Sequence, residues 1–172
     1  MLADAPDDAK MLLVYFAEPD EKIDLRTKQD TEELEKNKGQ RVLCIRVASK
    51  TAFEEDCRWA DIIYLHGGKT AKLMGILSEY PDIKGIFSGK TVAADSAGAH
   101  ALGALFYSKN SKTVGSGLGI LPLKIMAHYE DGAPDPLGDT RPELPSLLLR
   151  EYETKTIMIQ STHAGASIMS SP

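Results

Sequence analysis

The chain has 172 residues, enough for one domain with a sizeable hydrophobic core. Its composition, 42% hydrophobic and 26% charged, is ordinary for a globular protein, and its net charge of −5 offers no basic surface to nucleic acid. The two cysteines, Cys44 and Cys57, lack metal-type spacing, no apolar run reaches membrane-spanning length, and the acidic N-terminus lacks the apolar region of a signal peptide. We therefore expect one domain over residues 1–172, with residues 1–10 a loose segment, located in the cytoplasm, with neither nucleic acid nor membrane as a partner.

The first half of the chain alternates apolar runs with polar, helix-compatible segments. Strands are expected at residues 11–17, 41–48, 61–65 and 91–94, and helices at 26–38, 53–60 and 70–79. This alternation predicts an α/β fold with a mostly parallel sheet flanked by helices. Ligands of such sheets bind beyond the carboxyl ends of the strands, which is where the Gly67-Gly68 pair and Ser96 stand.

The stretch from Thr91 to His100 carries the strongest chemical signal. A short apolar strand leads to Ser96, which is followed by the small residues Ala97, Gly98 and Ala99. A serine on a tight turn between a strand and a helix has the geometry of a nucleophile elbow, and the small neighbours suit the crowded backbone there. The G-x-S-x-G pattern is met only in part, because an alanine replaces the first glycine. From these residues alone, Ser96 is equally well explained as the N-cap of a helix.

The second half of the chain is less regular. We expect a helix over residues 101–106, a polar, glycine-rich loop over 107–119, an extended segment over 120–127, an irregular loop with four of the nine prolines over 130–145, a short helix over 144–152 and a last strand over 156–160.

The four histidines are the candidates for a general base. His100 lies four residues after Ser96 and is expected to be structural, and His66 precedes the glycine pair and is expected to pack rather than react. His128 and His163 each follow an apolar strand, so each can present its imidazole at the carboxyl edge of the sheet.

Four segments together resemble peptidase family S51, which contains dipeptidase E (aspartyl dipeptidase) and the related cyanophycinases. They occur in matching order over about two-thirds of the chain, and they read G-G-K-T at residues 67–70, D-S-A-G-A at 95–99, G-L-G-I-L-P-L at 117–123 leading to H-Y at 128–129, and G-D-T-R at 138–141. The resemblance implies a fold like that of class I glutamine amidotransferases, with a serine where those enzymes use cysteine. It implies no metal and no organic cofactor.

The same resemblance assigns roles to individual residues. It implies that Ser96 is the nucleophile and His128 the general base. The resemblance further implies that the N–H groups of Gly68 and Ala97 form an oxyanion hole. It implies two substrate-binding residues, Thr70 and Arg141, of which Arg141 would bind the acidic side chain of an N-terminal aspartate. A guanidinium suits that task because it binds a carboxylate through two parallel hydrogen bonds.

The chain departs from the family pattern in three ways. Lys69 replaces an asparagine, and the glutamate that completes the catalytic triad is absent, because residues 163–165 read His-Ala-Gly in place of Pro-Glu-Gly. Losing the group that orients the histidine can cost roughly 10⁴ in rate. His163 and Asp131 are the candidate substitutes, with Glu130 also near His128 in sequence. The family's first strand is also missing before Met11, so we expect an exposed sheet edge that a second copy covers in a homodimer.

Two other interpretations remain open. The order serine, acid, histidine of α/β-hydrolases is met by Ser96, Asp131 or Asp135, and His163, although the glycine-pair turn and the segment before His128 then have no role. Alternatively, the chain is a catalytically inactive S51-like domain that acts as a binding or structural subunit. Our leading prediction is a serine peptidase that hydrolyses short peptides, dipeptides with an N-terminal aspartate, through an acyl-enzyme on Ser96.

Overall fold

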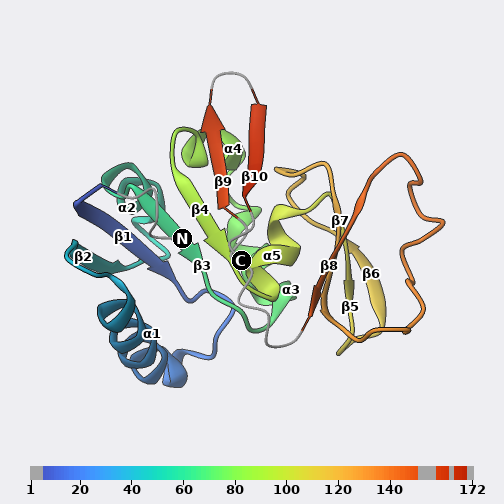
Figure 1. The fold of residues 1–172 in the computed structure, drawn as a ribbon, viewed down its shortest axis with the longest axis horizontal. Coiled ribbons are helices and arrows are strands. Elements are labelled where there is room, and N and C mark those ends of the chain that lie inside the picture. Colours follow the sequence, from blue (N-terminus) through green and yellow to red (C-terminus); the bar gives the residue numbers. More distant parts are fainter. Residues whose placement is uncertain (1–5, 151–157, 163–164, 170–172) are drawn as a thin grey trace.

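The computed structural model describes residues 6–150, 158–162 and 165–169, and it describes side chains within 6–150. Ten strands form two sheets, with helices packed on the first and between the two (Figure 1). The first sheet has the order β10-β9-β4-β3-β1-β2, with bounds β1 Asp8–Val14, β2 Val42–Val47, β3 Ile62–Leu65, β4 Thr91–Ala94, β9 Met158–Thr162 and β10 Gly165–Met169. Its strands β2, β1, β3 and β4 are parallel, whereas β9 and β10 are antiparallel to their neighbours. The expected α/β fold with mostly parallel strands is confirmed.

The second sheet was not predicted as a separate sheet. It has the order β6-β5-β7-β8, with bounds β5 Leu105–Ser108, β6 Thr113–Ser116, β7 Lys124–Tyr129 and β8 Ser146–Arg150. Strands β5, β7 and β8 are parallel, and β6 forms an antiparallel hairpin with β5.

The helices cover both faces of the first sheet. Their bounds are α1 Ile23–Asn37, preceded by a 3₁₀ turn at Asp20–Lys22, α2 Phe53–Trp59, α3 Thr70–Leu77, α4 Ile83–Phe87 and α5 Ala97–Leu102. Strand β1 alternates between the two cores: Met11 and Leu13 pack with Leu34 of α1, whereas Leu12 and Val14 enter the larger core on the opposite face. No helix in the described part of the chain combines the length and the apolar character that crossing a membrane requires.

Three expectations for the second half were wrong. The helix after the elbow ends at Leu102, the glycine-rich loop contains the β5–β6 hairpin, and the helix expected at 144–152 is strand β8. The leucines of β8 pair with β7, Leu147 with Ile125 and Leu149 with Ala127. A short apolar run does not distinguish a helix from a strand by its pattern alone, so the pairing partner decided the outcome.

Strand β2 forms one edge of the first sheet. Two of its valines are exposed, Val42 at 66% and Val47 at 37%. An exposed edge with apolar side chains is a surface that another chain can cover. The homodimer remains a prediction.

Candidate active site

Ser96 stands on a sharp turn between β4 and α5. Its backbone has φ 42° and ψ −106°, a conformation that costs a non-glycine residue roughly 1–3 kcal/mol. The surrounding backbone holds it there, because the Gly98 N–H donates to the Asp95 carbonyl at 2.7 Å and the His100 N–H donates to the Ser96 carbonyl at 3.0 Å. The predicted tight turn between a strand and a helix is thus the observed local structure, and Ser96 is partly exposed there.

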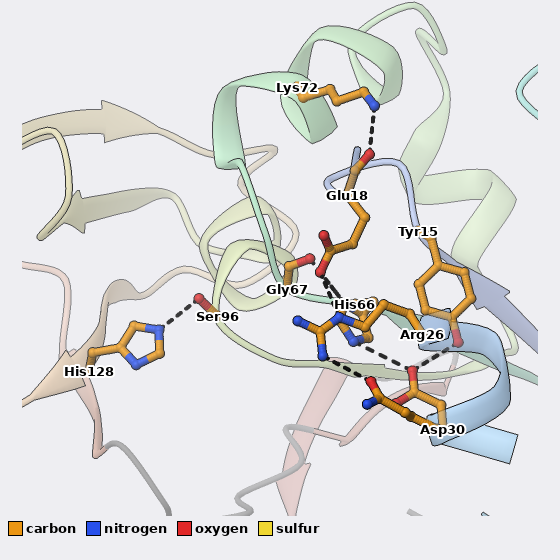
Figure 2. A network of polar contacts seen from close by, with 10 residues as sticks. Tyr15, Glu18, Arg26, Asp30, His66, Gly67, Lys72, Ser96 and His128 are labelled. Carbon is orange, nitrogen blue, oxygen red and sulfur yellow. Dashed lines mark hydrogen bonds and ion pairs between the residues drawn. The ribbon is translucent and has the colours of Figure 1, made fainter. Parts of the chain in front are cut away.

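His128 meets this serine from the other sheet. It sits in β7 at a register shift between Ala127 and Tyr129, with φ 58°. Bulges of this kind redirect a side chain, and here the imidazole Nε2 lies 2.9 Å from Ser96 Oγ (Figure 2). Two side chains predicted from separate segments therefore form the hydrogen-bonded pair that nucleophilic catalysis requires.

The glycine pair after β3 lies directly beside the elbow. A Cβ at Gly67 would lie 2.9 Å from an Asp95 carboxylate oxygen and 3.2 Å from Ser96 Cβ. Gly68 has φ 133°, and a Cβ there would lie 2.7 Å from the Ala17 carbonyl oxygen, so both positions require glycine. Among the described residues, the N–H groups of Gly68 and Ala97 have no hydrogen-bond acceptor. Unpaired amides beside a nucleophile can bind an oxyanion.

A cavity of about 770 Å³ opens onto the serine and histidine. Its lining comes from the glycine turn, the start of α3 and the β5–β6 hairpin, and includes Gly68, Lys69, Thr70, Ser96, His100, Lys109 and His128. Two of its described lining residues, Lys69 and Lys109, are cationic and none is acidic. The charged side chains among the described lining residues are therefore all of one sign, although Lys109 also pairs with Glu130.

His100 supports the floor of this cavity. Its Nε2 accepts the Ala127 N–H at 3.4 Å, so the neutral ring carries its proton on Nδ1 and donates it to Thr70 Oγ1 at 3.1 Å. Burial, together with the nearby His128, lowers the pKa of His100 to about 4, which keeps the ring neutral at pH 7. The structural role expected for His100 is therefore specific: it holds the backbone just before His128 and leaves the Thr70 hydroxyl proton free to point elsewhere.

This buried histidine predicts a pH effect on stability. Since the pKa of His100 in the folded chain lies below its unfolded value, the unfolded chain takes up the proton first, and stability falls as the pH drops from about 6.5 toward 4. The slope reaches about 1.4 kcal/mol per pH unit. His100→Gln retains an acceptor for Ala127 but cannot be protonated. Urea unfolding between pH 4 and 7 should give this variant a shallower profile than the native chain, and parallel profiles would contradict the assignment.

No described residue takes the place of the third triad member. Asp131 is bound by Arg150, with Nη2 2.7 Å from Asp131 Oδ1, and Glu130 pairs with Lys109. In the described part of the chain, Ser96 is the only hydrogen-bond partner of the His128 ring. Candidate His163 lies outside the described residues.

The alternative catalytic triad, in the serine, acid, histidine order of α/β-hydrolases, gains no support from the position of its candidate acid Asp135. Asp135 is held within its own loop, where it accepts the Leu137 N–H at 2.9 Å and the Ser146 hydroxyl at 3.3 Å. Within the described ranges there is also no group of three or more histidine, cysteine or carboxylate side chains that could hold a metal ion.

The two predicted substrate-binding residues have different positions. Thr70 lines the cavity at the start of α3. Arg141 lies in the proline-rich loop, exposed, where its guanidinium pairs with Glu143, and it is absent from the described lining of the cavity. The structure therefore brings Ser96, His128 and Thr70 together, and it leaves Arg141 outside. The binding role of Arg141 stays a prediction.

A polar cluster behind the glycine turn was missed in the sequence. It joins Glu18, Asp30 and His66, with Tyr15 and Arg26 at its margins (Figure 2). Only His66 stood out beforehand, through its place next to the glycine pair. The carboxylates come from segments 36 or more residues earlier in the chain, so no local pattern links them to the site.

The model of the family described as peptidase family S51 matches residues 13–168. Among solved structures, the chain is similar to "a Putative Peptidase E Protein from Listeria monocytogenes EGD-e", with a TM-score of 0.61 and 16% sequence identity over 95% of this chain and 87% of that one. At this identity the likeness concerns the fold alone. None of the curated proteins matches the chain.

Proposed function

Because the chain belongs to peptidase family S51, we propose that it is a serine peptidase that hydrolyses short peptides, in particular dipeptides with an N-terminal aspartate. The observation that carries the proposal is the 2.9 Å contact between Ser96 Oγ and His128 Nε2 on a strained elbow. A serine hydroxyl becomes a useful nucleophile when a base is held within hydrogen-bond distance. The resident groups need no cofactor for this reaction.

In the proposed reaction, Ser96 Oγ attacks the peptide carbonyl carbon while His128 Nε2 takes the hydroxyl proton. The negative charge that forms on the carbonyl oxygen is stabilised by the N–H groups of Gly68 and Ala97, which have no other acceptor in the described part of the chain. The C–N bond then breaks, and His128 gives its proton to the leaving amine. A water molecule, deprotonated by the same imidazole, releases the acyl group from Ser96.

The preference for an acidic residue rests on charge. Lys69 and Lys109 line the cavity without any acidic neighbour among its described lining residues. Lys109 pairs with Glu130, whereas Lys69 has no such partner in the part of the chain that the structure describes. The bound peptide is the one partner that this proposal requires, and its carboxylate would meet a positive potential near the nucleophile.

The experiment compares hydrolysis of Asp-Leu, Asn-Leu and Ala-Leu by the native chain, by Ser96→Ala and by Ser78→Ala. Ser78 is an exposed serine at the end of α3 and serves as the matched control. We expect hydrolysis of Asp-Leu above the other two by the native chain and the control, and none by Ser96→Ala. Turnover that survives in Ser96→Ala would exclude Ser96 as the nucleophile.

A fluorophosphonate distinguishes the remaining outcomes. If Ser96 is labelled but none of the three dipeptides is hydrolysed, the protein is a serine hydrolase and the proposed substrate class is wrong. A folded chain with neither labelling nor turnover would support the second candidate, a catalytically inactive S51-like domain. That candidate is favoured by one observation, the lack of a carboxylate partner for His128 among the described residues.

A further inference from the structure

A partly buried histidine, His66, follows strand β3 directly and precedes the glycine turn. His66 Nε2 lies 3.5 Å from Asp30 Oδ2, and His66 Nδ1 lies 3.7 Å from Glu18 Oε1 (Figure 2). Its ring packs against two tyrosines, with ring centroids 5.1 Å from Tyr15 and 5.9 Å from Tyr64. The side chain is only 12% exposed. Its orientation is therefore determined by Tyr64 of its own segment and by neighbours from two other segments of the chain, residues 15–18 and helix α1.

The nearest contact of this ring is with the glycine turn itself. His66 Nδ1 lies 3.0 Å from the carbonyl oxygen of Gly67. A carbonyl oxygen can only accept, so Nδ1 carries a proton and donates it. Gly67 in turn lies next to the proposed nucleophile, because a Cβ added at Gly67 would be 3.2 Å from Ser96 Cβ. The glycine thus stands between His66 and Ser96 (Figure 2).

The carbonyl that His66 binds belongs to the same peptide unit as the N–H of Gly68. This peptide is trans, and in a trans peptide the C=O and N–H bonds point in opposite directions. A donor that holds the Gly67 carbonyl on one side therefore directs the Gly68 N–H to the other side, where the cavity and Ser96 lie. The hydrogen bond also polarises the peptide and makes its N–H a stronger donor.

Such a constraint has a purpose at this position. A peptide between two glycines can rotate by half a turn at little steric cost, since neither residue has a Cβ. The next N–H along the chain is already held, because the Lys69 N–H donates to the Ala17 carbonyl at 2.9 Å. The contact with His66 holds the carbonyl oxygen of the peptide between the two glycines.

We propose that His66 is a positioning residue for catalysis, which holds the Gly67–Gly68 peptide so that the Gly68 N–H faces the oxyanion. Glu18 and Asp30 keep the imidazole in the orientation in which Nδ1 meets the Gly67 carbonyl. The inference rests on the proposed function for its effect on rate. The orientation of the peptide can be tested independently of activity.

Two amide substitutions separate this role from general packing. The side-chain nitrogen of asparagine reaches about the position of histidine Nδ1, whereas that of glutamine reaches about the position of Nε2. His66→Asn can therefore still donate to the Gly67 carbonyl, and His66→Gln can donate only toward Asp30. Both variants remove the ring from its contacts with the tyrosines, so any purely structural loss should affect them alike.

For hydrolysis of the preferred dipeptide, we expect His66→Gln to lower kcat by roughly 10- to 100-fold, a large part of the 10²- to 10³-fold loss that follows removal of an oxyanion donor. KM should change by less than about threefold, because the oxyanion forms only in the transition state. His66→Asn should retain kcat within about threefold of the native value. The rate of labelling by a fluorophosphonate, whose phosphoryl oxygen occupies the same hole, should follow kcat. Equal kcat values for the two variants would overturn the proposal.

Crystal structures of the two variants provide the independent test. The Gly68 N–H should face Ser96 in His66→Asn and should turn away or become disordered in His66→Gln. An unchanged peptide in both variants would refute the positioning role even if rates fell. If the native chain neither turns over nor labels, the proposed function fails, while the two structures still decide whether His66 holds the peptide.

Discussion

Alanine in place of His128 is expected to lower kcat/KM for the preferred dipeptide by roughly 10³-fold or more, because no other described side chain can take the proton from Ser96. His128 is exposed and the only hydrogen bond of its side chain among the described residues is with Ser96 Oγ, so the fold should remain intact. Initial rates at several substrate concentrations and the midpoint of thermal unfolding measure the two effects separately.

His128→Gln provides the matched control for this prediction. The glutamine oxygen can accept the hydrogen bond of the Ser96 hydroxyl but cannot take the proton at neutral pH, so this variant should be as inactive as His128→Ala. Activity within tenfold of the native chain in either variant would mean that His128 is not the base. The hydrogen bond alone would then account for the contact.

Alanine in place of Gly98 is expected to destabilise the folded chain by about 3 kcal/mol or more. A Cβ at this position would lie 2.1 Å from the carbonyl oxygen of Leu65 and 2.8 Å from the Cβ of Leu65. The carbonyl oxygen belongs to the backbone of β3 and cannot move aside like a flexible side chain, so α5 would have to shift. Since α5 follows Ser96 directly, catalysis in the remaining folded molecules should fall as well. Denaturant unfolding followed by circular dichroism measures the loss.

Gly75 is the matched control for that substitution. It lies in helix α3, is exposed, and a Cβ there would have no atom within 4 Å. Gly75→Ala should therefore stabilise the chain by up to about 1 kcal/mol through helix propensity. A Gly98→Ala variant as stable as Gly75→Ala would show that α5 can move away from β3 without cost, and the requirement for glycine at the elbow would be refuted.

The parts of the fold that the sequence predicted correctly are those with a strong local pattern. The apolar runs that became β1, β2, β3 and β4 are bounded by glycine, proline or charged residues, and the parallel pairing follows from their alternation with helices. The second half lacks such bounds. Its short segments do not distinguish a strand from a helix or a loop, and the strands there are formed by tertiary pairing: β6 pairs with β5, and β5 and β8 pair with β7.

The site divides in the same way. At Gly67, Gly68 and Gly98 the neighbouring atoms leave no room for a Cβ, so these positions require glycine, and the glycines can be seen in the sequence itself. The approach of His128 is not visible there, because it depends on a register shift in β7 and a positive φ that residue identity does not require. The pairing of Arg141 with Glu143 likewise depends on the path of a long loop.

The sequence by itself thus determined the fold class, the elbow serine and the glycine turn. Hydrophobic patterning acts between residues close together in the chain, and a position where only a small residue fits is marked in the sequence by that small residue, even though the atoms that exclude a Cβ come from distant segments.

The residues alone left His128 and His163 as candidate bases, and the family resemblance selected His128. Only the tertiary structure decided that the His128 ring reaches Ser96, that His100 is neutral and supports β7, and that His66 lies against the Gly67 carbonyl. The first two relations join residues 27 or more positions apart or depend on burial, and the orientation of the His66 ring depends on Glu18 and Asp30, which lie 36 or more positions earlier in the chain. A hydrogen bond or a pKa is defined only once the chain has brought its partners together.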